Sequence, residues 1–338
     1  MFDYADFKAL NTGVKMKILV VGGAGYIGSH MVKMLVDSGH EVVTFDNLSS
    51  GFRDAVLGGV FVQGDLANIT AIEAVFTQYQ PEAVMHFASY IQVGESVQHP
   101  AKYYLNNFTN TLNLLNAMVK FNVKNFIFSS TAAVFGEPEY VPIDEAHVKT
   151  PLNPYGRSKL MVEQILVDYE RAYGLKSVCL RYFNAAGADP QALLGERHEP
   201  ETHLIPLVLQ AISGKRSHIS VFGRDYDTPD GTCIRDYIHI VDLCSAHLLA
   251  LTQLASDGIS KRFNLGNGAG FSVQEVISVA EQVTGKKVKV IDAPRRDGDP
   301  ARLVADATLA KNTLGWSPIY TDLATIIAHA WAWECKSK

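Results

Sequence analysis

A run of glycines directly after a short apolar segment is the feature that most constrains what this chain can fold into. Residues 17–21 read Lys-Ile-Leu-Val-Val, residues 22–28 read Gly-Gly-Ala-Gly-Tyr-Ile-Gly, and an apolar pattern of helical period follows. Gly23, Gly25 and Gly28 therefore satisfy the spacing GxGxxG between an expected strand and an expected helix. Glycines at this place permit a tight turn and let a pyrophosphate approach the N-terminus of the helix. The segment predicts a dinucleotide-binding turn.

Beyond this turn, short apolar runs alternate with segments of helical period. We expect strands at 41–46, 60–63, 83–87, 125–130 and 176–182, and helices at 69–79, 103–121 and 155–173. Strands that alternate with helices of this length imply right-handed crossovers and a buried parallel sheet. The first half of the chain therefore predicts an α/β domain with a doubly wound parallel sheet of the Rossmann type.

The pattern loosens after residue 184. A helix is expected at 204–213 and a strand at 219–222, while 241–252 and 262–265 are expected to return to the sheet. We predict an N-terminal extension over 1–15, an NAD-binding domain over 16–184 plus 237–265, and a smaller, discontinuous α/β substrate domain over 185–236 plus 266–338. The cleft between the two domains is the expected ligand site.

Composition excludes several classes of protein. Apolar residues make up 47% of the chain and charged residues 19%, which is typical of a folded globular protein rather than a disordered one. The net charge of -5 disfavours nucleic acid as a partner. The four cysteines form no CxxC pair, so we expect no metal and a reducing, cytoplasmic location. No apolar run of membrane-spanning length and no secretory signal is seen, so no membrane partner is expected.

Asp46 indicates which dinucleotide the turn would bind. It ends the second expected strand, close to the spacing of about 20 residues at which an acidic side chain contacts the adenosine ribose. A carboxylate at this position repels a 2′-phosphate. We therefore favour NAD over NADP.

A tyrosine and a lysine stand one helical turn apart at Tyr155 and Lys159. Tyr4 and Lys8 have the same spacing, so the spacing alone decides nothing. The first pair differs in context, because it opens the helix that follows the expected strand ending in Thr131. We therefore take Tyr155 and Lys159 as candidate catalytic residues.

Seven motifs carry a family resemblance. The glycine motif, Phe128–Gly136 and Tyr155–Glu163 resemble the extended short-chain dehydrogenase/reductase family. Within it, the chain resembles the nucleotide-sugar 4-epimerases at Gly94–Ser96, Leu180–Asn184, Arg235–His239 and Ala293–Asp299. The motifs occur in order from about Met16 to Trp333, so the resemblance covers nearly the whole chain.

The resemblance implies interconversion of UDP-galactose and UDP-glucose through a tightly bound NAD. Hydride would leave sugar carbon 4, the ketosugar would rotate, and the hydride would return to its other face. Tyr155 would take and return the proton of the 4-hydroxyl, with Thr131 hydrogen-bonded to the same oxygen. Because a free phenol has a pKa of about 10, Lys159 and the positive nicotinamide would have to lower that of Tyr155.

The same resemblance implies the remaining contacts and a homodimer formed by the helices at Tyr103 and Tyr155. The implied cofactor contacts are Gly22, Gly25, Tyr26, Ile27, Gly28, Asp46, Asn47, Asp65, Leu66, Phe87, Ala88, Asn106, Ser129, Tyr155, Lys159 and Tyr182. The implied substrate contacts are Thr131, Tyr155, Asn184, His203, Leu204, Phe222, Arg235, Arg296, Asp299 and Leu303. His86 is expected to be a core histidine.

Three departures leave the substrate range open: Ile91 replaces a cofactor-contacting Lys, His203 replaces a sugar-facing Asn, and Leu303 stands where a Tyr or a smaller residue gates the pocket. A 4-epimerase of UDP-N-acetylhexosamine or UDP-uronate is the alternative. A 4,6-dehydratase is disfavoured because Ala132-Ala133 replaces its acid/base pair. An NAD-sensing binding protein without chemistry is disfavoured by the intact catalytic set.

Overall fold

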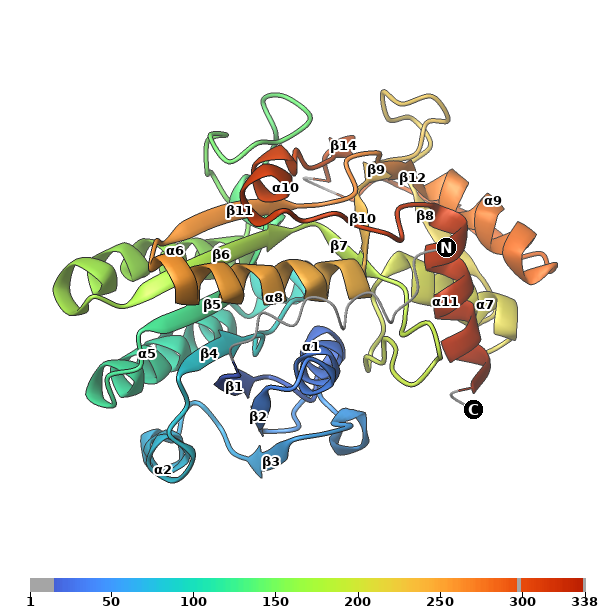
Figure 1. Ribbon diagram of the computed structural model, residues 1–338. Coiled ribbons are helices and arrows are strands. Elements are labelled where there is room, and N and C mark those ends of the chain that lie inside the picture. Colours follow the sequence, from blue (N-terminus) through green and yellow to red (C-terminus); the bar gives the residue numbers. More distant parts are fainter. Residues whose placement is uncertain (1–14, 297–298, 337–338) are drawn as a thin grey trace.

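A parallel sheet of seven strands forms the centre of the molecule (Figure 1). The computed structural model describes residues 15–296 and 299–336. The strands follow the order β11-β6-β5-β4-β1-β2-β3, and each neighbouring pair is parallel. Their bounds are β1 Lys17–Val21, β2 Glu41–Asp46, β3 Val60–Gln63, β4 Ala83–His86, β5 Asn125–Thr131, β6 Lys176–Tyr182 and β11 Lys261–Leu265. The predicted doubly wound α/β fold is confirmed.

Helices cover both faces of this sheet. On one face lie α1 (Tyr26–Asp37) and α8 (Ile240–Asp257), and on the other α2 (Ile69–Tyr79), α5 (Asn110–Lys120) and α6 (Pro154–Tyr173). Side chains of β1 alternate between the two cores, because successive residues of a strand point to opposite faces. Residues 241–252 were expected to return to the sheet, but they form part of the covering helix α8. Residues 261–265 do return to the sheet, as its edge strand β11.

The carboxyl ends of the parallel strands meet along one edge of the sheet. The order reverses between β1 and β4, where Val21 lies beside His86 in register. On the next two strands of the sheet, β5 and β6, Thr131 lies beside Tyr182. Ligands of open α/β sheets bind at such a reversal point, because the loops after the two central strands diverge there. The candidate residues at strand ends are therefore brought to one edge.

The segment expected as one helix over 103–121 is interrupted. α3 (Val93–Gln98) and α4 (Pro100–Tyr103) precede a π-helical segment over Tyr104–Thr109, and α5 continues from there. Asn107 is buried in that segment, and its side chain bonds the backbone of Tyr90 in both directions, accepting at 2.9 Å and donating at 3.0 Å. Single π-turns are often found at functional sites.

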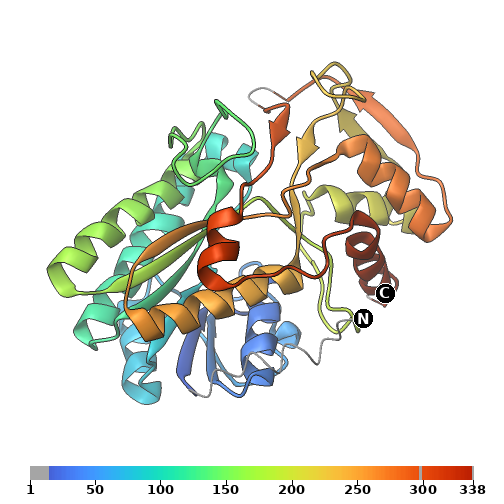
Figure 2. The ribbon, with the colours of Figure 1, turned by 45° about the horizontal axis from the view of Figure 1, so that its top comes forward.

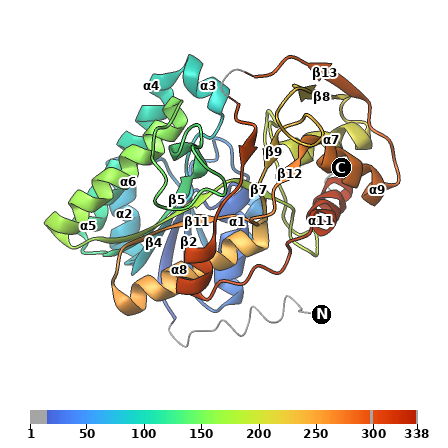
Figure 3. The ribbon, with the colours of Figure 1, turned by 90° about the horizontal axis from the view of Figure 1, so that it is seen from above.

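The remaining elements gather beside the sheet, on the right in Figure 3. α7 (Leu204–Ser213), α9 (Val273–Thr284) and α11 (Leu323–Lys336) enclose a separate apolar core with β8 (Ile219–Phe222). Short strands complete this half: β7 Asn184–Ala186, β9 Ile234–Arg235, β10 Tyr237–His239, β12 Phe271–Ser272, β13 Val290–Ala293 and β14 Arg302–Leu303. Two 3-10 turns lie at Arg53–Ala55 and Ala132–Val134.

The two-domain division stays a prediction, and one segment packs across it. α10 (Thr308–Leu314) places Ala310 and Leu314 in the core formed with α1 and α8, although it belongs by sequence to the second part (Figure 2). The extension predicted over 1–15, with Tyr4 and Lys8, lies outside the described residues except for its last residue. None of the described helices is both long and apolar enough to cross a membrane.

Candidate active site

The glycine turn joins β1 to α1 and lies directly against the end of β4. Gly22 has φ +80°, and a Cβ there would stand 2.4 Å from the backbone nitrogen of Ala88. A Cβ at Gly28 would stand 2.1 Å from the carbonyl oxygen of Gly22. Only glycine fits either position. The turn therefore brings the start of α1 into close contact with the neighbouring strand, as the sequence predicts.

The N-terminus of α1 is open toward a ligand. Gly25 occupies the N-cap position, and no side chain caps the helix. A Cβ at Gly25 would meet nothing nearer than the Gly22 oxygen at 3.5 Å, and Gly25 lines a small surface pocket. Uncapped N–H groups and the positive end of the helix dipole favour an anion such as a pyrophosphate.

Asp46 ends β2 beside this turn. Its two carboxylate oxygens accept hydrogen bonds from the backbone N–H groups of Ala24, at 2.9 Å, and Leu48, at 2.8 Å. Burial raises the pKa of Asp46, and these two hydrogen bonds lower it. Nearby, the Asn47 amide donates to Asp65 at 2.7 Å. A buried carboxylate next to an uncapped helix fits the ribose and pyrophosphate of NAD, so the residues present fit this cofactor.

Tyr155 and Lys159 project from the first turn and a half of α6. The Asn153 side chain caps this helix by accepting from the Gly156 N–H at 2.9 Å. Thr131, the last residue of β5, lies close to Tyr155, and its side chain lowers the pKa of the Tyr155 phenol. The structure thus brings together the three residues that the sequence assigned to catalysis, which come from a strand end and from the helix that follows it.

Lys159 is 2% exposed and firmly held. Its Nζ donates to the Ser89 hydroxyl at 2.6 Å and to the Ser129 carbonyl oxygen at 2.8 Å. Burial lowers the pKa of Lys159 to about 7, although Glu163 raises it. The ammonium is therefore close to its titration point at neutral pH.

The chain by itself holds Tyr155 protonated. Burial raises the pKa of its phenol, and the hydrogen bond with Thr131 lowers it. At the same edge, the Ser129 and Tyr182 hydroxyls form a hydrogen bond with each other. That Lys159 lowers the pKa of the Tyr155 phenol stays a prediction, whereas the position of Lys159 beside the end of β5 is observed.

The candidate substrate residues form two groups. Arg235 forms an ion pair with Asp299, and Leu303 lies beside Arg235 in the register of β9 and β14. The Arg296 guanidinium stacks over the Phe222 ring at 4.0 Å. The two guanidinium groups predicted to hold a diphosphate therefore already have partners in this structure.

Leu303, Asn184 and His86 have further contacts in the structure. Leu303 packs against the buried Val134 and Phe135, which follow Thr131 in the chain. The Asn184 amide donates to the carbonyl oxygen of Asp236 at 2.9 Å. His86 is fully buried beside Thr111, as expected of a core histidine.

Comparison with known proteins agrees with this geometry. The NAD dependent epimerase/dehydratase family matches residues 18–266. The chain belongs to this family. UDP-glucose 4-epimerase of Halalkalibacterium halodurans is 51% identical over 94% of this chain and 96% of its own length.

Solved structures of family members are also similar. The UDP-glucose 4-epimerase from Brucella ovis, in complex with NAD, has a TM-score of 0.92 and 48% identity, covering 94% of this chain and 98% of that one. The Bifidobacterium longum enzyme, in complex with NAD+ and UDP, has a TM-score of 0.89 and 38% identity, covering 95% and 98%. The likeness extends through both halves of this epimerase/dehydratase chain.

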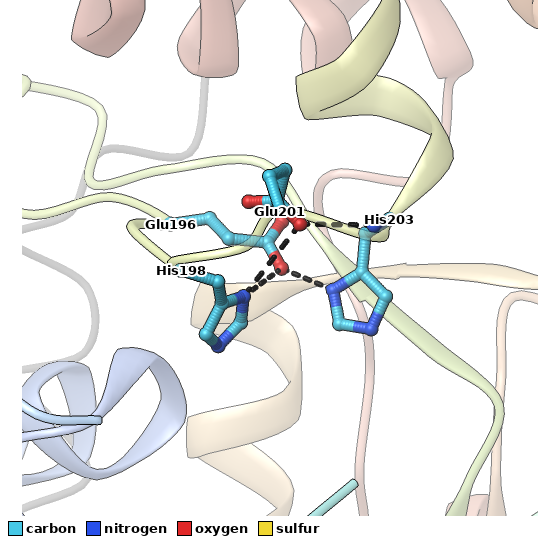
Figure 4. A group of neighbouring side chains, drawn as sticks. All are labelled: Glu196, His198, Glu201 and His203. Atoms are coloured by element: carbon cyan, nitrogen blue, oxygen red, sulfur yellow. Dashed lines mark hydrogen bonds and ion pairs between the residues drawn. The ribbon is translucent and has the colours of Figure 1, made fainter. Parts of the chain in front are cut away.

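The sequence did not predict one cluster of ionisable side chains in this family member. Glu196, His198, Glu201 and His203 converge in the loop before α7 (Figure 4). Although burial raises the pKa of Glu196, the two imidazoles lower it to about 2. Although burial lowers the pKa of His198, Glu196 and Glu201 raise it to about 10. The signal in the sequence was three Glu and two His among eight residues, Glu-Arg-His-Glu-Pro-Glu-Thr-His.

The same loop contacts the cofactor side of the molecule. The Tyr26 hydroxyl donates to the carbonyl oxygen of Gly187 at 2.7 Å. Arg197 stacks on Phe52 at 3.5 Å and forms an ion pair with Asp54. His203, predicted to face the sugar, instead directs its Nδ1 to Glu196.

Proposed function

We propose that this chain interconverts UDP-galactose and UDP-glucose by epimerisation at sugar carbon 4, with NAD as its bound cofactor. One observation carries the proposal: the Tyr155 and Thr131 side chains lie together, beside an anchored Lys159, at the sheet edge that also holds the uncapped glycine turn. The 48–51% identity to UDP-glucose 4-epimerases over 94% of the chain supports this substrate.

Bound NAD supplies a hydride acceptor and donor, so no net oxidation of the sugar is needed. Tyr155 takes the proton of the 4-hydroxyl while carbon 4 is oxidised, and it returns that proton when carbon 4 is reduced from its other face. Thr131 would orient the shared oxygen, because its side chain lies next to that of Tyr155. Lys159 is a positioning residue whose bonds to Ser89 and Ser129 fix its ammonium near the strand end.

The sugar must turn while its nucleotide stays bound. Arg235 and Arg296 offer cations for the diphosphate, and Arg–phosphate bonding is strong and directional. Binding would exchange the contacts with Asp299 and the Phe222 ring for phosphate oxygens and a base. We propose a homodimer and a cytoplasmic location on the sequence arguments given above.

The deciding experiment is incubation of the purified chain with UDP-galactose and no added cofactor. We expect UDP-glucose to form, and NAD to be released when the protein is denatured. Tyr155→Phe should lower turnover by about 10²–10⁴-fold, the range for removal of a general acid–base group. Tyr169→Phe is the matched control, because Tyr169 lies in the same helix and bonds Asn116 instead. Full activity of Tyr155→Phe, or no product from the wild type, would refute the proposal.

A further inference from the structure

A group of four side chains outside the catalytic residues offers metal-ligand atoms at close range. Glu196, His198, Glu201 and His203 each present one donor atom, and these four atoms all lie within 4.8 Å of one another. Figure 4 shows the two imidazole rings and two carboxylates directed toward a common point. All four come from one short loop between β7 and α7.

Two of the distances between these atoms are close to those of a tetrahedral site. His198 Nδ1 lies 3.2 Å from Glu196 Oε1 and 3.7 Å from Glu201 Oε1. With metal–ligand bonds of about 2.0–2.2 Å, the edges of a tetrahedral Zn²⁺ site measure about 3.3–3.6 Å. Small side-chain movements would therefore complete the coordination.

The competing explanation for the cluster is ion pairing between its histidines and glutamates. It leaves one buried nitrogen without a hydrogen bond. His203 forms hydrogen bonds, through Nδ1 to Glu196 and through its backbone N–H to Glu201 at 2.9 Å. His198 Nδ1 is buried and has no hydrogen-bond partner among the described residues, despite the two carboxylates beside it. Buried polar atoms in native proteins are nearly always paired. An ion at the centre would give this nitrogen its partner.

We propose that Glu196, His198, Glu201 and His203 bind one divalent transition-metal ion of the Zn²⁺ type. Two imidazole nitrogens and two carboxylate oxygens suit Zn²⁺, whereas Ca²⁺ and Mg²⁺ prefer oxygen ligands alone. The carboxylates are 5% and 3% exposed, and a divalent ion would balance their charge in place of the two protonated imidazoles. The His203 side chain is 41% exposed and provides the path of entry.

The position of the site gives the ion a structural role. His203 is the N-cap residue of α7, and the His198 ring contacts Tyr26, the first residue of α1, with ring centroids 6.4 Å apart. A bound ion would therefore fix the loop that connects the cofactor-side helix with the substrate-side helix. This departs from the expectation of no metal, which rested on the cysteines alone.

The test is a Zn²⁺ titration of the full chain without an affinity tag, after chelator treatment, in competition with a chromophoric zinc indicator. We expect one ion per chain and a rise in the temperature of unfolding on addition of Zn²⁺. His198→Gln and Glu201→Gln should each weaken binding by at least about tenfold, since even supporting residues of metal sites contribute 10–100-fold. His99→Gln and Cys335→Ser are controls, because both residues are exposed and lie outside the cluster, and they should leave the affinity unchanged.

Equal affinity of wild type and both cluster variants would overturn the proposal, as would the absence of stoichiometric binding. Each variant is first compared with the wild type by circular dichroism in chelator, so that loss of the fold is recognised. If a variant does not fold, a measurement on the wild type alone still tests the proposal. X-ray absorption at the zinc edge should indicate two imidazole and two carboxylate ligands. Sulfur ligands or a fully hydrated ion would contradict it.

Discussion

Burial of Lys159 makes the stability of the cofactor-free chain depend on pH. Burial lowers the pKa of Lys159 from 10.5 to about 7 in the folded chain. Between these values the unfolded chain binds more protons than the folded one, so the free energy of unfolding rises with pH across this window. Below pH 7 both states are protonated and the full cost of burying the ammonium remains.

Lys159→Met, which removes the charge at similar length, isolates this effect. We expect the wild type to gain stability relative to Lys159→Met as the pH rises from near 7 to near 10. Urea unfolding of both proteins at the two ends of the range measures the difference. A difference that does not change with pH would show that folding does not lower the pKa of Lys159.

Leu303 is the residue expected to set tolerance for a substituent at sugar carbon 2. It is half-buried, and it lies beside Arg235 and against Phe135. Because Leu is smaller than Tyr, we expect UDP-N-acetylgalactosamine to be converted, but more slowly than UDP-galactose. The expected difference is about 1–3 kcal/mol in transition-state binding, typical of steric discrimination.

Leu303→Tyr should then abolish the slower reaction and spare the faster one. The measurement is kcat/KM for both sugars in both proteins. If the two substrates respond equally to the substitution, or if the wild type prefers the acetylated sugar, Leu303 is not the gate.

At the scale of elements, two glycines at the start of α1 are expected to serve different purposes. Gly28 is needed for folding and Gly25 for binding the cofactor. A Cβ at Gly28 would stand 2.1 Å from the Gly22 oxygen, so Gly28→Ala should cost at least about 1–3 kcal/mol of stability. A Cβ at Gly25 would meet only the Gly22 oxygen, at an ordinary van der Waals distance of 3.5 Å, so Gly25→Ala should fold with a loss of about 1 kcal/mol or less. It should nevertheless lose bound NAD, because the methyl group occupies the approach of the pyrophosphate.

Thermal unfolding and the absorbance of released NAD measure both effects. Full retention of NAD by Gly25→Ala would argue against pyrophosphate binding at this helix. Wild-type stability of Gly28→Ala would show that the turn relaxes more easily than its geometry implies.

Helices and strands with a regular apolar pattern could be predicted from the sequence. Strands of only two or three residues could not. The helix over Leu204–Ser213 and the strand over Ile219–Phe222 have the expected bounds, since each carries a regular apolar pattern. Ile234–Arg235 is too short for any period and is defined by its pairing with segments about 40 and 70 residues away in sequence. Tertiary contacts, rather than local propensity, form such strands.

Residues of the candidate site also differ in how well the sequence predicts them. Tyr155 and Lys159 could be predicted because their helix follows the strand ending in Thr131. The convergence of Glu196 with His203 depends on the path of an irregular loop, which has no pattern to indicate it. The contacts of Arg235 and Arg296 with Asp299 and Phe222 likewise depend on where the loops lie.

At the scale of the whole molecule, apolar side chains are exposed beside α6. Val97 in α3 is 63% exposed and Leu105 is 60% exposed, and these segments lie together with α6 in Figure 3. We expect this surface to form the homodimer. Val97→Glu should shift the protein toward monomer in light scattering coupled to gel filtration, whereas Ile259→Glu, at a residue 54% exposed on another loop, should not. A wild-type monomer would refute the expectation.

The edge strand β11 has a consequence for synthesis on the ribosome. It pairs with β6 along its whole length, yet about 80 residues separate the two in sequence. Until residue 265 has emerged, the backbone of β6 presents an unpaired edge that can pair with another nascent chain. A fragment truncated at residue 184 would keep that edge permanently and should aggregate. The central sheet is therefore expected to depend for its solubility on a segment that is made only after residues 185–260.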